Sequence, residues 1–367
     1  METAAQSTVV LWLAFAVSFV FGVVAQKTHF CTLGAVSDIF NMGDWGRMRM
    51  WLLAIGVAIL GSSALHAAGI IDLGKSIYRT PNFTWLSYLV GGFIFGTGMV
   101  FASGCGAKTL IRIGGGSLKS LVVFLVLGLF AYMTMKGVFG VLRVNLLEKA
   151  VITFSGGQDI PALLTAAGMA PGSAFLLAVL AIGGGLIAAC LAQRNFWTVD
   201  NLLGGFGIGL AVVAAWYISG HIGYLPENPE TLEEAFIATN SGRMEALTFV
   251  APPAYTLDLL MLWSDTSRKL TFGIASVLGV IAGSCGWCLL TGQFRWEGFV
   301  SLEDTASHLL GAALMGFGGV VAMGCTVGQG ISGFSTLALG SVLTFLSIVA
   351  GATVTLKFQY WRLMREA

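Results

Sequence analysis

Long apolar stretches alternate with short polar connections along the whole chain. A helix needs about 20 mostly apolar residues to cross the hydrocarbon core of a bilayer. The pattern predicts nine such helices, near residues 8–25, 50–69, 85–103, 118–141, 172–192, 200–218, 270–291, 304–322 and 338–356. The apolar stretch 247–263 also contains Pro252, Pro253 and Asp258, so we expect an interfacial or re-entrant segment there. The predicted fold class is an all-α, polytopic membrane protein.

The composition agrees with this pattern and excludes several other classes of protein. Of the 367 residues, 56% are hydrophobic and 10% are charged, whereas soluble domains carry about 25% charged residues. A net charge of +1 gives no sign of the clustered basic face of a nucleic-acid binder, so no nucleic-acid partner is expected. The six cysteines lie in or beside apolar segments, unlike those of a disulfide-stapled secreted domain. The first residues lack the basic start of a signal peptide, so the first apolar stretch is expected to be retained.

The charges of the connecting loops predict the orientation of the chain. Cytoplasmic loops of membrane proteins are enriched in Lys and Arg. With nine spans and the N-terminus outside, the inner loops and the C-terminal tail hold many of the basic residues, and the acidic stretch 227–245 lies outside. Some basic residues remain in the outer loops. We expect an N-terminus outside and a C-terminus in the cytoplasm.

The two halves of the chain resemble each other in sequence. Residues 91–111 align with 311–331 at an offset of 220, with eight identities in 21 positions. We expect a first repeat at 1–150, a linker at 151–199 with one inverting span, and a second repeat at 200–367. Each repeat has four spans, so the single linker span gives the second repeat the opposite orientation. Inverted internal repeats are a recurrent transporter design, with solute sites where interrupted helices meet near the midplane.

Helix breaks at matching places are expected to form the functional site. The segments 104–108 and 324–330 each follow a span and precede about ten residues, too few to cross the membrane. We expect each to begin a re-entrant half-helix, whose free N–H groups and positive dipole end attract an anion. A third break lies at 27–34. The expected path residues at these breaks are Cys31, Cys105, Cys325, Lys108, Gln329, Thr326, Gly104, Gly324, His29 and Arg112.

Different side chains are expected to contribute differently to this path. Lys108 and Arg112 supply positive charge, unless they extend to the cytoplasmic interface instead. Gln329 and Thr326 are neutral donors. A protonated Cys thiol is a weak donor and a soft, polarisable contact. A lining of such thiols favours an anion with a sulfur end, such as thiosulfate, over a hard oxyanion such as sulfate.

The segments that carry these breaks resemble the YeeE/YedE family of bacterial membrane proteins. They are GxxFGxGxxxxxGCGxK, LMGFGGVVAMGCTVGQGISGFS, HFCTLGAVSD and the residues 294–297, and the match covers nearly the whole chain. The resemblance implies thiosulfate import through the bacterial inner membrane, with the ion passed along Cys31, Cys105 and Cys325 by S–H···S contacts. It also implies a small cytoplasmic sulfur-carrier partner, TusA-like or YeeD-like. The family includes members linked to selenium and to other sulfur compounds, so these solutes are alternatives.

A function of another class is suggested by the C-x-x-C motif of Cys285 and Cys288. The pair would serve a membrane thiol–disulfide oxidoreductase. No second metal-ligand pair lies at matching spacing, and the motif falls within a predicted span, so we expect a packing role. No nucleotide-binding motif, catalytic triad or pair of carboxylates at membrane depth is recognised. We therefore expect a transporter with no catalytic residues, no metal and no cofactor.

Overall fold

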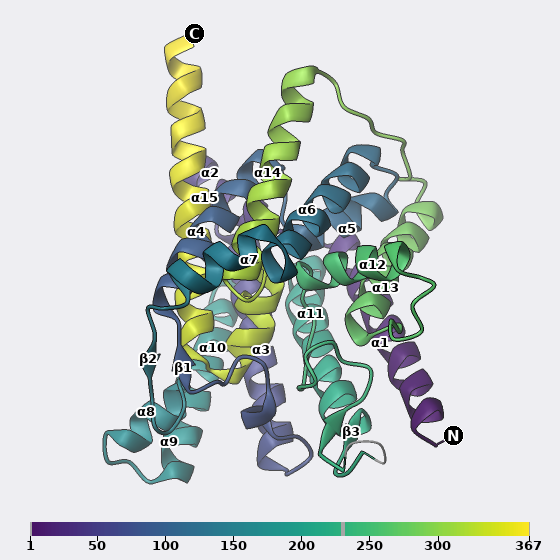
Figure 1. The fold of residues 1–367 in the computed structure, drawn as a ribbon. Helices are drawn as coiled ribbons and strands as arrows, with labels where there is room; N and C mark the ends of the chain where they lie inside the picture. Colours follow the sequence, from purple (N-terminus) through teal and green to yellow (C-terminus); the bar gives the residue numbers. More distant parts are fainter. Residues whose placement is uncertain (1, 229–231, 367) are drawn as a thin grey trace.

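The computed structural model describes residues 2–228 and 232–366, and these are mostly helical (Figure 1). The α-helices are α1 (Glu2–Lys27), α2 (Thr32–Met42), α3 (Gly46–Ala67), α4 (Trp85–Phe101), α5 (Gly106–Gly114), α6 (Leu118–Lys136), α7 (Val138–Leu142), α8 (Ile160–Ala166), α9 (Pro171–Ala178), α10 (Gly185–Leu191), α11 (Val199–Tyr217), α12 (Ala251–Met261), α13 (Phe272–Leu290), α14 (Leu302–Val321) and α15 (Leu339–Glu366). The predicted all-α class is confirmed.

Short π or 3-10 turns and two small sheets complete the described chain. The turns are η1 (Leu73–Lys75), η2 (Arg143–Leu147), η3 (Val179–Gly184), η4 (Arg194–Phe196), η5 (Ile218–Ile222), η6 (Gly328–Gly333) and η7 (Phe334–Thr336). The antiparallel pairs are β1 (Asn82–Phe83) with β2 (Ile152–Thr153), and β3 (Tyr224–Leu225) with β4 (Ala235–Phe236). Both sheets lie in connections between helices.

Eight helical runs within the described residues are long and apolar enough to cross a membrane. They are Ala5–Met42, Gly46–Ala67, Trp85–Gly114, Leu118–Lys136, Pro171–Leu191, Val199–Ile222, Phe272–Leu290 and Leu339–Arg365. They coincide with eight of the nine predicted spans and make the chain a multi-pass membrane protein. The remaining prediction, 304–322, forms the 20-residue α14, whose first turn holds Glu303 and Asp304 and is therefore more polar. The stretch 247–263 forms the 11-residue α12, which is too short to span.

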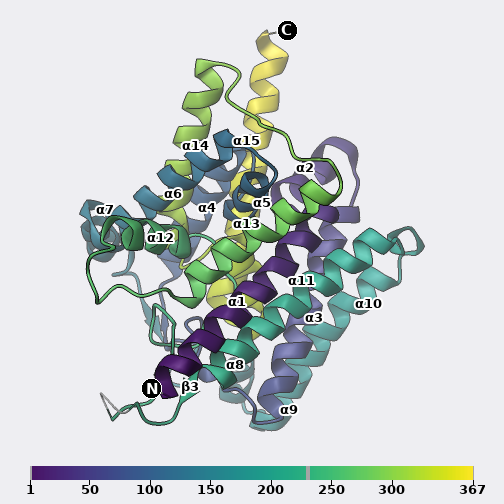
Figure 2. The same ribbon diagram turned by 90° about the vertical axis from the view of Figure 1, so that its right-hand side faces the viewer.

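Helices from the two halves of the chain pack against each other. Helix α1 contacts α13 along its length, and its counterpart α11 contacts α3 (Figure 2). Likewise α4 packs on α15, and α14 on α6. If each helix is replaced by its counterpart in the other half, the α1–α13 contact becomes the α11–α3 contact, and the α4–α15 contact becomes the α14–α6 contact. The two termini lie at opposite ends of the molecule (Figure 1). This pattern supports the proposed division into two repeats.

The two halves approach each other closely at the crossing of α4 and α14. A Cβ built on Gly98 would lie 2.7 Å from the Gly311 carbonyl oxygen, and one on Gly311 would lie 2.6 Å from the Gly98 oxygen. Gly91 and Gly318 are in similar reciprocal contact. Gly91 aligns with Gly311 in the sequence repeat, and Gly98 with Gly318, so the two contacts are equivalent. Because 91 meets 318 and 98 meets 311, the two helices run antiparallel, which supports the proposed inversion.

Replacing Gly98 by Ala is expected to destabilise the protein by about 1–3 kcal/mol, because the new methyl group overlaps the backbone of α14. The melting temperature of the purified protein should fall by about 2–6 °C. Gly184→Ala is the matched control, because a Cβ at helical Gly184 meets no atom within 4 Å. Equal melting temperatures for the two variants would contradict a tight crossing.

Candidate functional site

Each of the three cysteines predicted to line the path immediately precedes a helical segment. Cys31 precedes α2, Cys105 precedes α5, and Cys325 precedes the helical residues 326–336, which include η6 and η7. Their exposed fractions are 9%, 2% and 0%, respectively. The first N–H groups of a helix have no partner within the helix, so each thiol lies beside potential anion donors.

The chain reverses in the same way before Cys105 and before Cys325. Ser103 and Met323 adopt left-handed conformations, with φ angles of 56° and 57°. The following residues, Gly104 and Gly324, each donate a backbone hydrogen bond to the carbonyl oxygen five residues earlier, at 2.9 and 2.8 Å. Such a hydrogen bond terminates each of the two helices, α4 and α14, and the chain then enters the next helical segment. A left-handed non-glycine residue is uncommon, so its occurrence at both breaks marks them as equivalent.

Cys325 is held by backbone groups from two segments. Its sulfur accepts hydrogen bonds from the N–H groups of Gly328 and Phe249, both at 3.3 Å. The Thr248 hydroxyl lies 3.9 Å from the same sulfur. The thiol therefore joins the start of one half-helix to the segment that leads into α12.

Cys105 is within electrostatic reach of the other two thiols, Cys31 and Cys325. The Thr326 hydroxyl lies beside it, yet forms no hydrogen bond of normal geometry within the described residues. Cys31 accepts the N–H of Gly34 at 3.4 Å, which caps α2. The structure thus brings the three thiols into one buried group.

Basic side chains gather beside Cys31 and Cys105. Lys108 is within electrostatic reach of both thiols, of Arg112 and of Arg47. A Cβ on Gly104 would lie 3.1 Å from Lys108 and 3.9 Å from Arg112, so this glycine lies beside both side chains.

His29 and Arg47 belong to the same basic group. His29 is within electrostatic reach of Lys108 and Arg47. The Arg47 guanidinium covers Gly34 and forms an ion pair of 3.1 Å with Asp38. Arg47 is not among the path residues predicted from the sequence. Its contact with Gly34 shows that it lies beside the Cys31 break.

Gln329 is placed differently from the expectation of a lining donor. Its amide nitrogen donates to the carbonyl oxygen of Ala322 at 2.7 Å, at the end of α14. Its amide oxygen is buried and has no partner within the described residues. The donor end of Gln329 therefore secures the helix break, and its acceptor end is left without a hydrogen bond.

The C-x-x-C motif packs between helices. Cys288 is fully buried, and its sulfur accepts the Gln26 amide at 3.2 Å across the contact of α1 and α13. The Lys27 amine lies 5.6 Å from the centre of the Trp287 ring in the same contact. This environment favours the packing role predicted for the pair.

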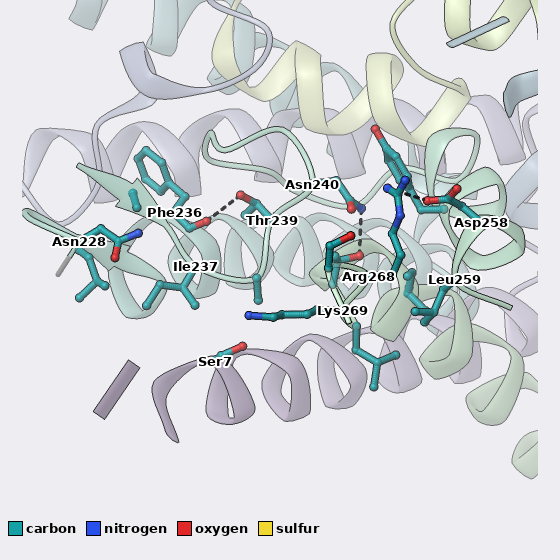
Figure 3. Close-up of a pocket in the computed structure, with 18 of the residues that line it drawn as sticks. Ser7, Asn228, Phe236, Ile237, Thr239, Asn240, Asp258, Leu259, Arg268 and Lys269 are labelled. Carbon is teal, nitrogen blue, oxygen red and sulfur yellow. Dashed lines mark hydrogen bonds and ion pairs between the residues drawn. The ribbon is translucent and has the colours of Figure 1, made fainter. Parts of the chain in front are cut away.

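A large cavity lies apart from the thiols, near the N-terminal end of α1 (Figure 3). Its volume is about 820 Å³, and its lining includes Ser7, Lys136, Arg268 and Lys269. Arg268 is paired with Asp258 at 3.0 Å. None of the ten predicted path residues lines this cavity, so its size does not identify it as the site. The thiols themselves are buried.

The sequence is similar to known membrane proteins. Residues 27–354 match a family described as sulphur transport. The thiosulfate transporter TsuA of Escherichia coli (strain K12) is 27% identical over 329 residues, which cover 84% of this chain and 83% of that protein. The thiosulfate transporter TsuA of Spirochaeta thermophila is 23% identical over 356 residues, which cover 93% and 96% of the two chains. These similarities indicate a transport protein and not an enzyme.

The burial of the thiols predicts slow chemical labelling. In variants that retain only Cys105 or only Cys325, we expect maleimide to react at least about tenfold more slowly in detergent micelles than after denaturation in SDS, because reaction requires access to the thiolate. A cysteine-free chain with Glu227→Cys, in an exposed loop, should react equally fast in both states. Mass spectrometry of the labelled protein measures the rates. Rapid labelling of native Cys325 would show that the group is open.

Proposed function

The chain belongs to the sulphur-transport family, and from that membership we propose that it imports thiosulfate across the bacterial inner membrane. The match covers most of the chain and confirms the YeeE/YedE resemblance of the sequence motifs. The oxidoreductase alternative has no support from the family or from the packed environment of Cys288.

The observation that carries the proposal is the buried group of three thiols at the starts of helical segments. Thiosulfate has a soft sulfur at one end and oxygens at the other. Protonated thiols contact the sulfur end, and N–H groups at the helix starts bind the oxygens. Cys31 and Cys105 come from one half of the chain and Cys325 from the other, so the ion passes between the two halves.

The order of the thiols suggests a direction for the relay. Cys325 lies beside Thr248, in the segment between α11 and α12 that is predicted to be outside, and receives the ion first. Cys105 and then Cys31 follow, and Lys108 with its basic neighbours draws the ion to the cytoplasmic side. A dianion moving toward a negative interior is opposed by about 4–5 kcal/mol per 100 mV. A small cytoplasmic sulfur-carrier protein that consumes the ion would supply a driving force.

Removing single thiols tests the relay. Cys105→Ala and Cys325→Ala should each lower the uptake of labelled thiosulfate into proteoliposomes by about tenfold or more, since each deletes one contact along the path. Cys190→Ala is the matched control. Cys190, near the end of α10, is equally buried, but its sulfur lies against the carbonyl oxygen of Arg49 in α3.

A double variant tests the competing use of cysteines in the same assay. Cys285→Ser with Cys288→Ser should retain most of the uptake. Normal uptake by Cys105→Ala or Cys325→Ala would show that the thiol relay is wrong, whichever result the double variant gives.

The thiol lining also predicts solute preference. In competition against labelled thiosulfate, unlabelled thiosulfate should inhibit uptake at concentrations at least about tenfold below those of sulfate, because sulfate offers no sulfur end to the thiols. Sulfite and selenite complete the series. Stronger inhibition by selenite than by thiosulfate would assign the chain to the selenium compounds instead.

A further inference from the structure

Tyr78 is a buried residue of the connection between α3 and α4 whose hydroxyl group is unused. Its exposed fraction is 3%, and its hydroxyl makes no hydrogen bond within the described residues. Leaving a buried polar group without a partner is unfavourable for folding. A ligand bound to the hydroxyl would supply the missing hydrogen bond.

The hydroxyl of Tyr78 points to the break that contains Cys325. A Cβ built on Gly328 would lie 3.5 Å from the Tyr78 hydroxyl and 2.5 Å from the Thr248 hydroxyl. The N–H of Gly328 donates to the Cys325 sulfur. Two hydroxyls from separate outer connections therefore approach the same helix start as the thiol. A side chain at position 328 would collide with Thr248, so only glycine permits this approach.

The Tyr78 ring is fixed in place by its neighbours. It packs edge-on against Trp216, with ring centres 6.2 Å apart and an interplanar angle of 84°. The indole N–H of Trp216 donates to Ser335 at 2.9 Å, and the Gln158 amide donates to the Tyr78 carbonyl at 3.2 Å. The connection that contains Tyr78 pairs with the outer segment before α12 through an isolated β-bridge between Ser76 and Met244. The hydroxyl thus needs no large rearrangement to meet a ligand.

The charges around the hydroxyl are compatible with an anion. Arg79 follows in the chain, donating to the Thr336 carbonyl oxygen at 2.8 Å and lying 3.7 Å from Asp159. The Glu245 carboxylate is within electrostatic reach of Tyr78. It accepts the Ser241 N–H at 2.9 Å, and burial raises the pKa of this carboxyl group.

We infer that Tyr78 and Thr248 bind the oxygens of a sulfur oxyanion while Cys325 contacts its terminal sulfur. This inference rests on the proposed function, in which Cys325 is the outermost thiol. The two O–H groups and the S–H group distinguish the two ends of the solute. An ion that lacks either the oxygens or the soft sulfur makes only part of these contacts.

Tyr78→Phe tests the inference because it removes only the hydroxyl. We expect the KM for thiosulfate uptake and the Kd of detergent-purified protein for thiosulfate to rise about 10- to 100-fold. The melting temperature without thiosulfate should stay the same or rise, since the deleted hydroxyl has no partner within the described residues. Tyr132→Phe, a half-buried tyrosine of α6 beside Asp258, should leave KM unchanged. A fall in melting temperature with unchanged KM would show that Tyr78 is merely structural.

Thr248 variants provide an independent measurement. Thr248→Val should raise KM, and Thr248→Ser, which keeps the hydroxyl, should restore it to near the original value. Cys325→Ala is run alongside to separate two kinds of failure. If Cys325→Ala loses uptake while Tyr78→Phe keeps its KM, this inference is wrong and the relay stands. If neither variant changes uptake, the proposed function and this inference fail together.

Discussion

The architecture depends on the backbone contact of α4 with α14. Apolar helices gain little from each other in lipid unless their backbones pack closely, because lipid chains are as apolar as their side chains. The reciprocal pairs Gly91–Gly318 and Gly98–Gly311 provide that packing. Because the helices are antiparallel, their last residues, Phe101 and Val321, lie toward opposite ends of this contact. The chain reverses after each of them, and Cys105 and Cys325, which are 220 residues apart in the sequence, are both buried just after these reversals.

The chemical character of this group is neutral at its centre and positive on one side. Thiols, hydroxyls and backbone N–H groups surround the three helix starts. The positively charged side chains, among them Arg47 and Lys108, lie on the side of Cys31 and Cys105. A selective path must bind its ion firmly enough for entry and weakly enough for release. Neutral donors meet both needs better than a buried cation, whose charge is expensive to place within the membrane and would hold a dianion tightly.

The breaks and the cysteines that follow them could be predicted because their signals are local. An apolar run of fixed length ends in Gly-Cys, and the same pattern returns at an offset of 220. The positions of Arg47, Tyr78 and Thr248 could not be predicted in this way. Tyr78 and Thr248 lie in connections without periodic pattern, and Arg47 lies in the first turn of α3. Only tertiary contacts, such as that of Ser76 with Met244, bring such residues to the thiols. Gln329 shows the converse, because its place in a motif did not reveal that its amide would be used by the Ala322 carbonyl.

The exchange of partners between the halves limits how the protein can move. Helix α1 of the first half packs on α13 of the second, and α11 of the second packs on α3 of the first. Rigid-body rocking of one half against the other, a common mode of alternating access, would separate both contacts at once. The scaffold is thus better suited to remain stationary during turnover. In the proposed transport, entry and release of the ion would then require only small displacements of the segments that begin at Cys105 and Cys325 and of the neighbouring loops.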